Sequence, residues 1–442
     1  MEIRRDRYLD RLIAHKGNGR VKIVTGIRRC GKSYLLFQLF KRHLTETGVR
    51  PSHIIEIQLE DRSNKELRDP DACLAFIKKQ IKDQKPYYLL IDEVQLMGEF
   101  EDVLNSCLHI QNLDTYVTGS NSKFLSKDII TEFRGRGDEM YLRPLSFREF
   151  RTTCEDKPFD DAWTEYMTYG GLPYCALLPS REEKADYLKR LFDEVFLRDI
   201  IERNRVQNDA QMESLLNVIS SAVGSLTNPR KLEDTFASSG MGKLSASTIK
   251  QYLDYLCDAF MIEQAERYDI KGKRYISTPY KYYFTDTGLR NARLNLTSSS
   301  SFAPRPSLSE LKWPSVWRRF RQLEETHLME NVVYNELCLR GYSVDVGVVE
   351  INERQADGKY VRKQIEVDFV CNKADERVYV QSAFSIPTTE KRLQEERPLV
   401  NVGDGFRKVV VTKDNVLRHN DENGILIMSL QEFLMDERAL EK

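Results

Sequence analysis

The sequence predicts an α/β fold with a parallel-sheet core, a helical middle region and a second α/β block near the C-terminus. Two observations support this prediction. The first 145 residues alternate between strand and helix patterns, which is typical of a parallel sheet with helices on both faces. From about residue 322 a helical pattern is followed by four more strand patterns, so the α/β alternation restarts there.

The hydrophobic pattern predicts each element of the first block in order. Helices are expected over residues 4–15, 32–44, 70–83 and 99–110. Strands are expected over residues 21–26, 53–60, 87–94, 115–120 and 140–146. The strand that begins YYLLI is apolar without alternation, which indicates that both of its faces are buried.

Residues 146–293 have mainly helical patterns. A helix over 245–260, followed by a strand and a returning strand, resembles a winged helix. Its candidate wing carries Lys271, Lys273 and Arg274, which could contact nucleic-acid phosphates. The alternative to a nucleic-acid-binding module is a structural lid, which packs on the first block and couples its motions to the rest of the chain.

Residues 294–321 are rich in serine and proline and are interpreted as a linker or inserted loop. We therefore expect a core domain over 1–145, a lid and winged region over 146–293, and a C-terminal α/β domain over 322–442.

Composition narrows the class of protein. The 67 Lys and Arg residues nearly balance the 68 Asp and Glu residues, so overall charge gives no argument for nucleic-acid binding. The longest strictly apolar run has six residues, far short of the roughly 20 of a membrane-spanning helix. The N-terminus lacks the apolar stretch of a secretory signal, and the eight cysteines form no CxxC pair. We expect a cytoplasmic protein with no membrane partner.

A phosphate-binding loop is the most specific motif. Residues 26–33 read GIRRCGKS, which matches G-x-x-x-x-G-K-[ST] between a predicted strand and a predicted helix. Glycines let the backbone N–H groups face phosphate oxygens at a helix N-terminus. The pKa of a thiol also tends to fall at a helix N-terminus, so we expect a lowered pKa for Cys30. The predicted nucleotide-binding residues are Gly26, Ile27, Arg28, Arg29, Cys30, Gly31, Lys32, Ser33 and Tyr34. Lys32 is expected to reach the β- and γ-phosphates, and Ser33 to bind Mg²⁺.

Two acidic residues end the apolar strand at 87–91. We expect Asp92 to hold Mg²⁺ through water and Glu93 to act as the general base that polarises the attacking water. The pair favours the ATP-hydrolysing branch of phosphate-loop proteins with an added strand between the two motifs.

Two later loops complete the predicted site. Residues 118–122 follow a strand, and Asn121, or failing that Ser120, is the candidate to sense the γ-phosphate. Arg136 precedes the last strand of the block and is the candidate to reach the nucleotide of a neighbouring subunit. Each loop could instead be an ordinary solvated turn.

These motifs together resemble the prokaryotic AAA-type ATPases whose C-terminal half is known only as a domain of unknown function. The resemblance extends through YMTYGGLP (166–173), DTGLRNA (286–292) and IEVDFV (365–370), and excludes the 294–321 insert. It implies Mg²⁺-dependent ATP hydrolysis and assembly into a ring or another homo-oligomer.

The C-terminal block also resembles the restriction-endonuclease-like fold. In that fold a helix Glu, a strand Asp and an (Asp/Glu)-x-Lys triplet bind metal and activate water. Glu330 and Asp368 match the first two positions, but Gln381 and Ala383 stand where the triplet's acid and lysine are expected. We therefore expect a catalytically degenerate domain, although Glu366 and Asp368 share one strand face and keep a weak metal site conceivable.

The sequence thus predicts an ATPase that uses ATP and Mg²⁺ to drive a conformational change, with a protein client not identified by the sequence. A nucleic-acid-binding regulator that uses ATP as a switch is the main alternative. An ATP-dependent nuclease is the third, and the missing triplet argues against it.

Overall fold

The computed structural model describes residues 2–120, 136–238, 244–294, 296, 315–354 and 359–441. The chain divides into two compact units. The first comprises Met1–Leu145 with the short segments Leu172–Tyr174 and Leu256–Met261, and the second comprises the rest. No helix among the described residues is both long and apolar enough to cross a membrane.

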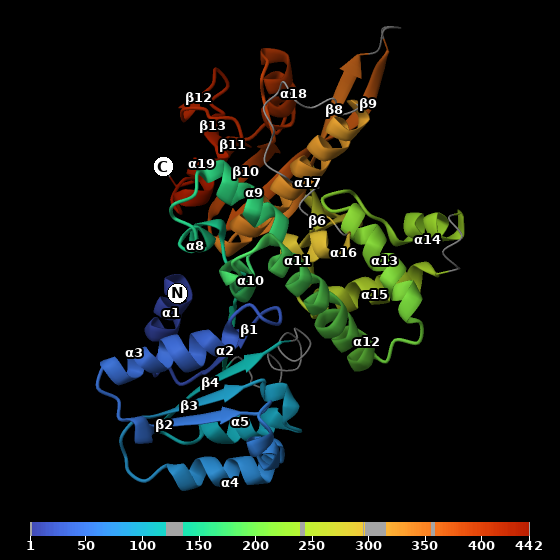
Figure 1. The fold of residues 1–442 in the computed structure, drawn as a ribbon. Coiled ribbons are helices and arrows are strands. Elements are labelled where there is room, and N and C mark those ends of the chain that lie inside the picture. The colour runs from blue at the N-terminus through green and yellow to red at the C-terminus, as the bar shows by residue number, and fades with distance from the viewer. Residues whose placement is uncertain are drawn as a thin grey trace. The chain divides into compact units, whose positions relative to one another are not determined.

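The first unit contains a five-stranded sheet in the order β2-β3-β4-β1-β5, and every pairing is parallel (Figure 1). Its strands are β1 (Val21–Thr25), β2 (Ile54–Gln58), β3 (Tyr87–Asp92), β4 (Leu113–Gly119) and β5 (Gly137–Tyr141). The predicted parallel α/β core is confirmed. The sequence predicts that residues 53–60 supply the added strand, but these residues form β2 at the edge of the sheet. The strand that lies between β1 and β3 is β4.

Helices cover both faces of this sheet (Figure 1). They are α1 (Asp6–Ala14), α2 (Lys32–Tyr34), the π-helical segment Leu35–Phe40, α3 (Lys41–Glu46), α4 (Pro70–Gln80) and α5 (Phe100–Leu108). Short 3₁₀ turns lie at Pro51–His53, Arg62–Arg68 and Val94–Leu96. The helix predicted after the phosphate loop is therefore continuous from 32 to 46, with one wider π turn inside it.

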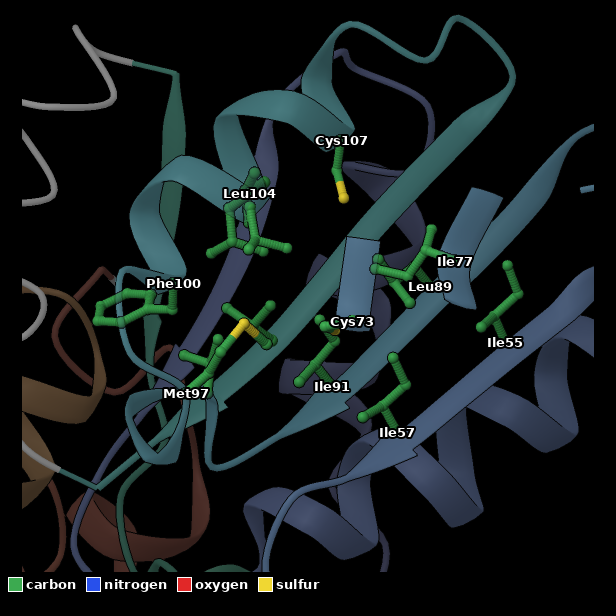
Figure 2. Close-up of a cluster of buried hydrophobic side chains, with 14 of the residues drawn as sticks. Ile55, Ile57, Cys73, Ile77, Leu89, Ile91, Met97, Phe100, Leu104 and Cys107 are labelled. Carbon is green, nitrogen blue, oxygen red and sulfur yellow. The ribbon is translucent and has the colours of Figure 1, made fainter. Parts of the chain in front are cut away.

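A buried apolar cluster fixes α4 and α5 against one face of the sheet (Figure 2). Leu89 and Ile91 of β3 point into it, and Ile77 of α4 and Leu104 of α5 meet them there. All four side chains are fully buried or nearly so. Each such side chain stabilises the fold by roughly 1.5–3 kcal/mol through removal from water, so β3 is held firmly where its C-terminal acids enter the site.

The second unit combines a helical region with an eight-stranded mixed sheet. Its helices are α8 (Phe147–Arg151), α9 (Phe159–Tyr169), α10 (Pro173–Leu177), α11 (Arg181–Arg190), the π-helical segment Leu191–Leu197, α12 (Arg198–Asn204), α13 (Asp209–Ser221), α14 (Pro229–Ser238), α15 (Ala246–Asp258), α16 (Thr287–Arg293), α17 (Ser315–Leu339), α18 (Thr389–Val400) and α19 (Leu430–Met435). The start of α10 and the end of α15 belong to the first unit. Helix α17 begins at Ser315, so the last part of the predicted 294–321 linker is helical.

The sheet of the second unit has the order β12-β13-β11-β10-β9-β8-β6-β7. Its strands are β6 (Ile262–Asp269), β7 (Arg274–Phe284), β8 (Ser343–Arg354), β9 (Tyr360–Lys373), β10 (Glu376–Ala383), β11 (Arg407–Thr412), β12 (His419–Asn420) and β13 (Leu426–Ser429). The β6–β7 hairpin, predicted as a wing, pairs through β6 in parallel with β8. Strands on either side of the Ser/Pro-rich stretch therefore belong to one sheet (Figure 1).

Two of the motifs that carry the family resemblance interlock inside the second unit. Asp286 accepts a hydrogen bond from the Gly171 backbone N–H over 2.7 Å and caps α16 through the N–H of Leu289 over 3.0 Å. Gly170 has φ +72°, and a Cβ there would lie 2.1 Å from Asp286 Oδ1. The YMTYGGLP and DTGLRNA motifs are thus two halves of one packing contact.

We predict that Gly288→Ala destabilises the second unit by about 2–3 kcal/mol. A Cβ at Gly288 would lie 2.2 Å from the backbone oxygen of Tyr169, which cannot rotate away as a side chain could. Scanning calorimetry should show the lower transition temperature. Gly405→Ala is the control, because a Cβ there meets nothing within 4 Å. Equal transition temperatures for the two variants would contradict the contact.

Candidate nucleotide-binding site

The phosphate loop follows β1 and leads into α2. Gly26 has φ +144° and Gly31 has φ +101°, both in the region that favours glycine. A Cβ at Gly26 would also lie 2.2 Å from the Leu142 backbone oxygen. The two motif glycines are therefore required by the path of the backbone, which curls between a strand end and a helix N-terminus as an anion-binding loop does.

The ammonium group of Lys32 lies at the centre of this loop. Its side chain is buried, and Nζ donates to the backbone oxygens of Gly26 over 3.0 Å and Ile27 over 3.2 Å. Nζ also lies 3.9 Å from Glu93 Oε1. The positive charge is thus held between the loop and the predicted base.

Asp92 accepts hydrogen bonds from hydroxyl groups of two other elements. Ser33 Oγ at the start of α2 donates to Asp92 Oδ1 over 2.9 Å, and Thr118 Oγ1 of β4 donates to the same oxygen. Burial raises the pKa of Asp92 above its ordinary value, although both hydroxyl bonds act to lower the pKa. This desolvated carboxylate beside a serine hydroxyl matches the hard oxygen ligands that Mg²⁺ prefers.

Besides Lys32, two residues hold Glu93. Its backbone lies in the left-handed region at φ +50°, and its N–H donates to Thr118 Oγ1 over 2.8 Å. Gln95 Nε2 donates to Glu93 Oε2 and, over 3.2 Å, to Ser120 Oγ. Among the residues that the structure describes, the buried Oε1 of Gln95 has no hydrogen-bond partner. Sequence reasoning gave Thr118 and Gln95 no role, although both lie within motifs that it singled out.

Arg5 braces the phosphate loop from outside the motif. This buried arginine precedes α1, donates from Nη1 to the Cys30 oxygen over 3.3 Å and from Nη2 to the Arg143 oxygen over 2.6 Å. Cys30 is fully buried, and burial raises the pKa of its thiol. The expected lowering of this pKa at a helix N-terminus is therefore wrong, because the loss of hydration outweighs the nearby positive charges.

The other predicted site residues occupy varied positions. Ile27 is buried, Arg28 pairs with Glu60 over 3.1 Å, Arg29 is exposed with φ +64°, and Tyr34 is 43% exposed. Asn121 lies outside the described residues. Exposed Arg136 accepts a backbone bond from Val21 at the start of β1, so it lies at the edge of the sheet opposite the phosphate loop. Arg136 therefore lies away from the phosphate loop of its own chain.

The C-terminal carboxylates do not fit a metal centre. Lys281 of β7 contacts Glu330 of α17 and Glu366 of β9, and Asp368 Oδ2 accepts the Ser382 N–H over 2.8 Å. Gln381 Oε1 accepts the Asp368 N–H over 3.3 Å instead of providing a carboxylate. Throughout the part of the chain that the structure describes, no group of three or more His, Cys, Asp or Glu residues could hold a metal ion.

A parallel sheet with a phosphate loop after β1 and an acidic pair at the end of β3 defines a P-loop module of the AAA type. Residues 18–151 match the family model described as an AAA domain, and residues 160–300 match a domain of unknown function. An uncharacterised protein of Haemophilus influenzae is 31% identical over 438 residues, covering 98% of each chain. The chain belongs to the prokaryotic AAA-type P-loop ATPase family in which the AAA domain is followed by a domain of unknown function.

More distant likenesses include a second sequence and two solved structures. An uncharacterised protein of Methanocaldococcus jannaschii is 24% identical, covering 91% of this chain and 83% of its own. The Aeropyrum pernix ORC1 protein in complex with DNA is 13% identical over 68% of this chain and 94% of its own, with a TM-score of 0.28. Cdc6p from Pyrobaculum aerophilum is 11% identical over 67% and 94%, with a TM-score of 0.30. The family assignment rests on the sequence matches.

We predict that Arg5→Ala weakens nucleotide binding about tenfold, the equivalent of roughly 1.4 kcal/mol. The truncation removes the donors that hold the Cys30 and Arg143 backbone oxygens. Titration calorimetry with a slowly hydrolysed ATP analogue measures the loss. Arg4→Ala, at the exposed neighbouring arginine, is the control. Unchanged affinity in Arg5→Ala would show that the loop keeps its shape without this brace.

Proposed function

We propose that this protein hydrolyses ATP with Mg²⁺ and that hydrolysis drives a conformational change in a homo-oligomer. The main support is the meeting of Lys32, Ser33, Asp92 and Glu93 at the C-terminal edge of one parallel sheet. Lys32 and Ser33 come from the phosphate loop and α2, whereas the two acids end a strand that is not adjacent to β1.

Each residue has a separate task in this proposal. Lys32 binds the β- and γ-phosphates, and the Ser33 and Asp92 oxygens hold the metal. When bound, Mg²⁺ neutralises the charge that develops on the transferred phosphoryl group. Glu93 orients water and accepts its proton, which requires release of at least one carboxylate oxygen from Lys32 or Gln95. Gln95 positions this base relative to β4 through Ser120.

A nucleic-acid-binding regulator remains the second candidate. Lys271, Lys273 and Arg274 are exposed around the turn of the β6–β7 hairpin, as expected of residues that contact phosphates. Steady-state ATPase rates with and without duplex DNA and RNA separate the two candidates. Strong stimulation supports a nucleic-acid-coupled function, and Glu93-dependent turnover without stimulation favours a protein client.

We predict that Glu93→Gln binds ATP with near wild-type affinity but turns over at least ~100-fold more slowly, because a neutral amide cannot accept the proton. Phosphate release and calorimetry give the two quantities. Lys32→Ala should lose binding itself, and Glu99→Gln, at an exposed glutamate nearby, should change neither. Wild-type turnover in Glu93→Gln would exclude this residue as the base.

We predict that Arg136 acts across a subunit boundary. Arg136→Ala and Glu93→Gln should each be inactive alone, whereas an equimolar mixture should regain about a quarter of the wild-type rate. In random mixing, half of the sites keep Glu93, and half of these have a neighbour that keeps Arg136. Light scattering with chromatography establishes the assembly beforehand. A mixture as inactive as its components would contradict an arginine donated by a neighbour.

A further inference from the structure

The second unit buries an acidic cluster that ATP hydrolysis does not use. Glu330 on α17 and Asp368 on β9 are 8% and 9% exposed, and Glu366 lies two residues before Asp368 on the same strand face. These three carboxylates, from two elements, lie near one lysine, and the Glu366 side chain is 32% exposed. In the restriction-endonuclease-like fold, which the sequence of these elements resembles, the helix Glu and the strand Asp bind a divalent cation together with a third acid, and Gln381 stands in that third position here.

Lys281 places an ammonium group among these carboxylates. Its side chain is 5% exposed, and Nζ lies 2.9 Å from Glu330 Oε1 and 2.6 Å from Glu366 Oε1. Burial alone would lower the pKa of Lys281, but the charges of Glu330 and Glu366 raise it above the ordinary value. The lysine therefore stays charged in a position where an unpaired ammonium would be costly.

One oxygen of each carboxylate already has a polar partner. Tyr283 OH donates to the same Glu330 oxygen over 2.7 Å, and Ser382 N–H donates to Asp368 Oδ2 over 2.8 Å. Burial, and then the charge of Glu330, raise the pKa of Asp368 well above its usual range. Gly224, at φ +69°, lets backbone approach the other Glu330 oxygen closely, since a Cβ there would be 3.2 Å from Oε2.

We propose that the ammonium group of Lys281 takes the place of a divalent cation in this cluster, so that the C-terminal sheet is a metal-free scaffold. Because Lys281 lies on β7, Glu330 on α17 and Glu366 on β9, the same ion pairs tie the β6–β7 hairpin to the C-terminal strands and helix. This inference is independent of the proposed ATP hydrolysis.

The test compares the full-length wild type and Lys281→Met in thermal unfolding with and without 1 mM Mn²⁺, in the absence of nucleotide. We expect wild type to show no Asp368-dependent shift in Tm with Mn²⁺. Lys281→Met should melt about 10 °C lower, because removing one partner leaves buried carboxylates uncompensated. Mn²⁺ should then restore about half of the loss by binding the folded state alone.

Two further variants make the result specific. Adding Asp368→Asn to Lys281→Met should abolish the Mn²⁺ response, which distinguishes this cluster from the Ser33 and Asp92 site. Lys273→Met removes an exposed lysine from the same hairpin and should behave as wild type. An Asp368-dependent Mn²⁺ shift in the wild type would overturn the proposal, as would a Lys281→Met protein with wild-type Tm and no Mn²⁺ response.

If Lys281→Met does not fold, the proposal is tested with the variant that also carries Glu330→Gln and Glu366→Gln. Removing an ion together with both partners is often nearly neutral for stability, so this triple variant should fold with a Tm close to wild type. Failure of the triple variant to fold would show that Lys281 does something other than balance the cluster's charge, and it would overturn the proposal.

Discussion

The Asp92 carboxylate links three elements of the first unit by hydrogen bonds. It ends β3, accepts a hydrogen bond from Ser33 beyond the phosphate loop, and accepts another from Thr118 on β4. Thr118 in turn accepts the backbone N–H of Glu93, so one hydroxyl joins both acids to the intervening strand. Because burial raises the pKa of Asp92, this arrangement lowers stability at neutral pH, a compromise often found where a site is prepared for a ligand.

The sequence was sufficient to predict most strands and helices of the first unit, although β5 begins three residues before its predicted range. The roles of Lys32, Ser33, Asp92 and Glu93 stay predictions. Each depends on local signals: apolar runs, helical spacing, and glycines at fixed positions in a phosphate loop. Arg5, Thr118 and Gln95 were not predicted as site residues because their contacts depend on tertiary structure. Arg5, for example, reaches Cys30 across 25 positions of sequence, and an arginine before an amphipathic helix has no pattern that indicates such a contact.

In the second unit, too, local sequence patterns did not identify contacts between distant segments. Local patterns predicted most of its strands, but the parallel pairing of β6 with β8 joins segments on either side of the Ser/Pro-rich stretch. Composition suggested a boundary there, whereas strand pairing depends on partners that a local pattern does not identify. The domain limits at 293 and 322 accordingly stay a prediction. The interlocked Gly170 and Asp286 also show that a recognisable motif can be a packing contact.

The buried Asp92 carboxylate of the first unit has neutral hydrogen-bond partners, whereas Glu330 and Glu366 of the second unit have a charged partner. This difference distinguishes a site that can bind a cation from a scaffold that already contains one. Asp92 has hydroxyl partners, which stabilise its charge only in part, and it lies beside a loop shaped to hold anions. Glu330 and Glu366 instead have a full positive charge within 3 Å, that of Lys281 on β7. A cation arriving at the first cluster adds a missing charge, whereas at the second it must displace a lysine that the fold already positions. The chemistry of this chain is therefore expected at the end of β3, where charge is still uncompensated.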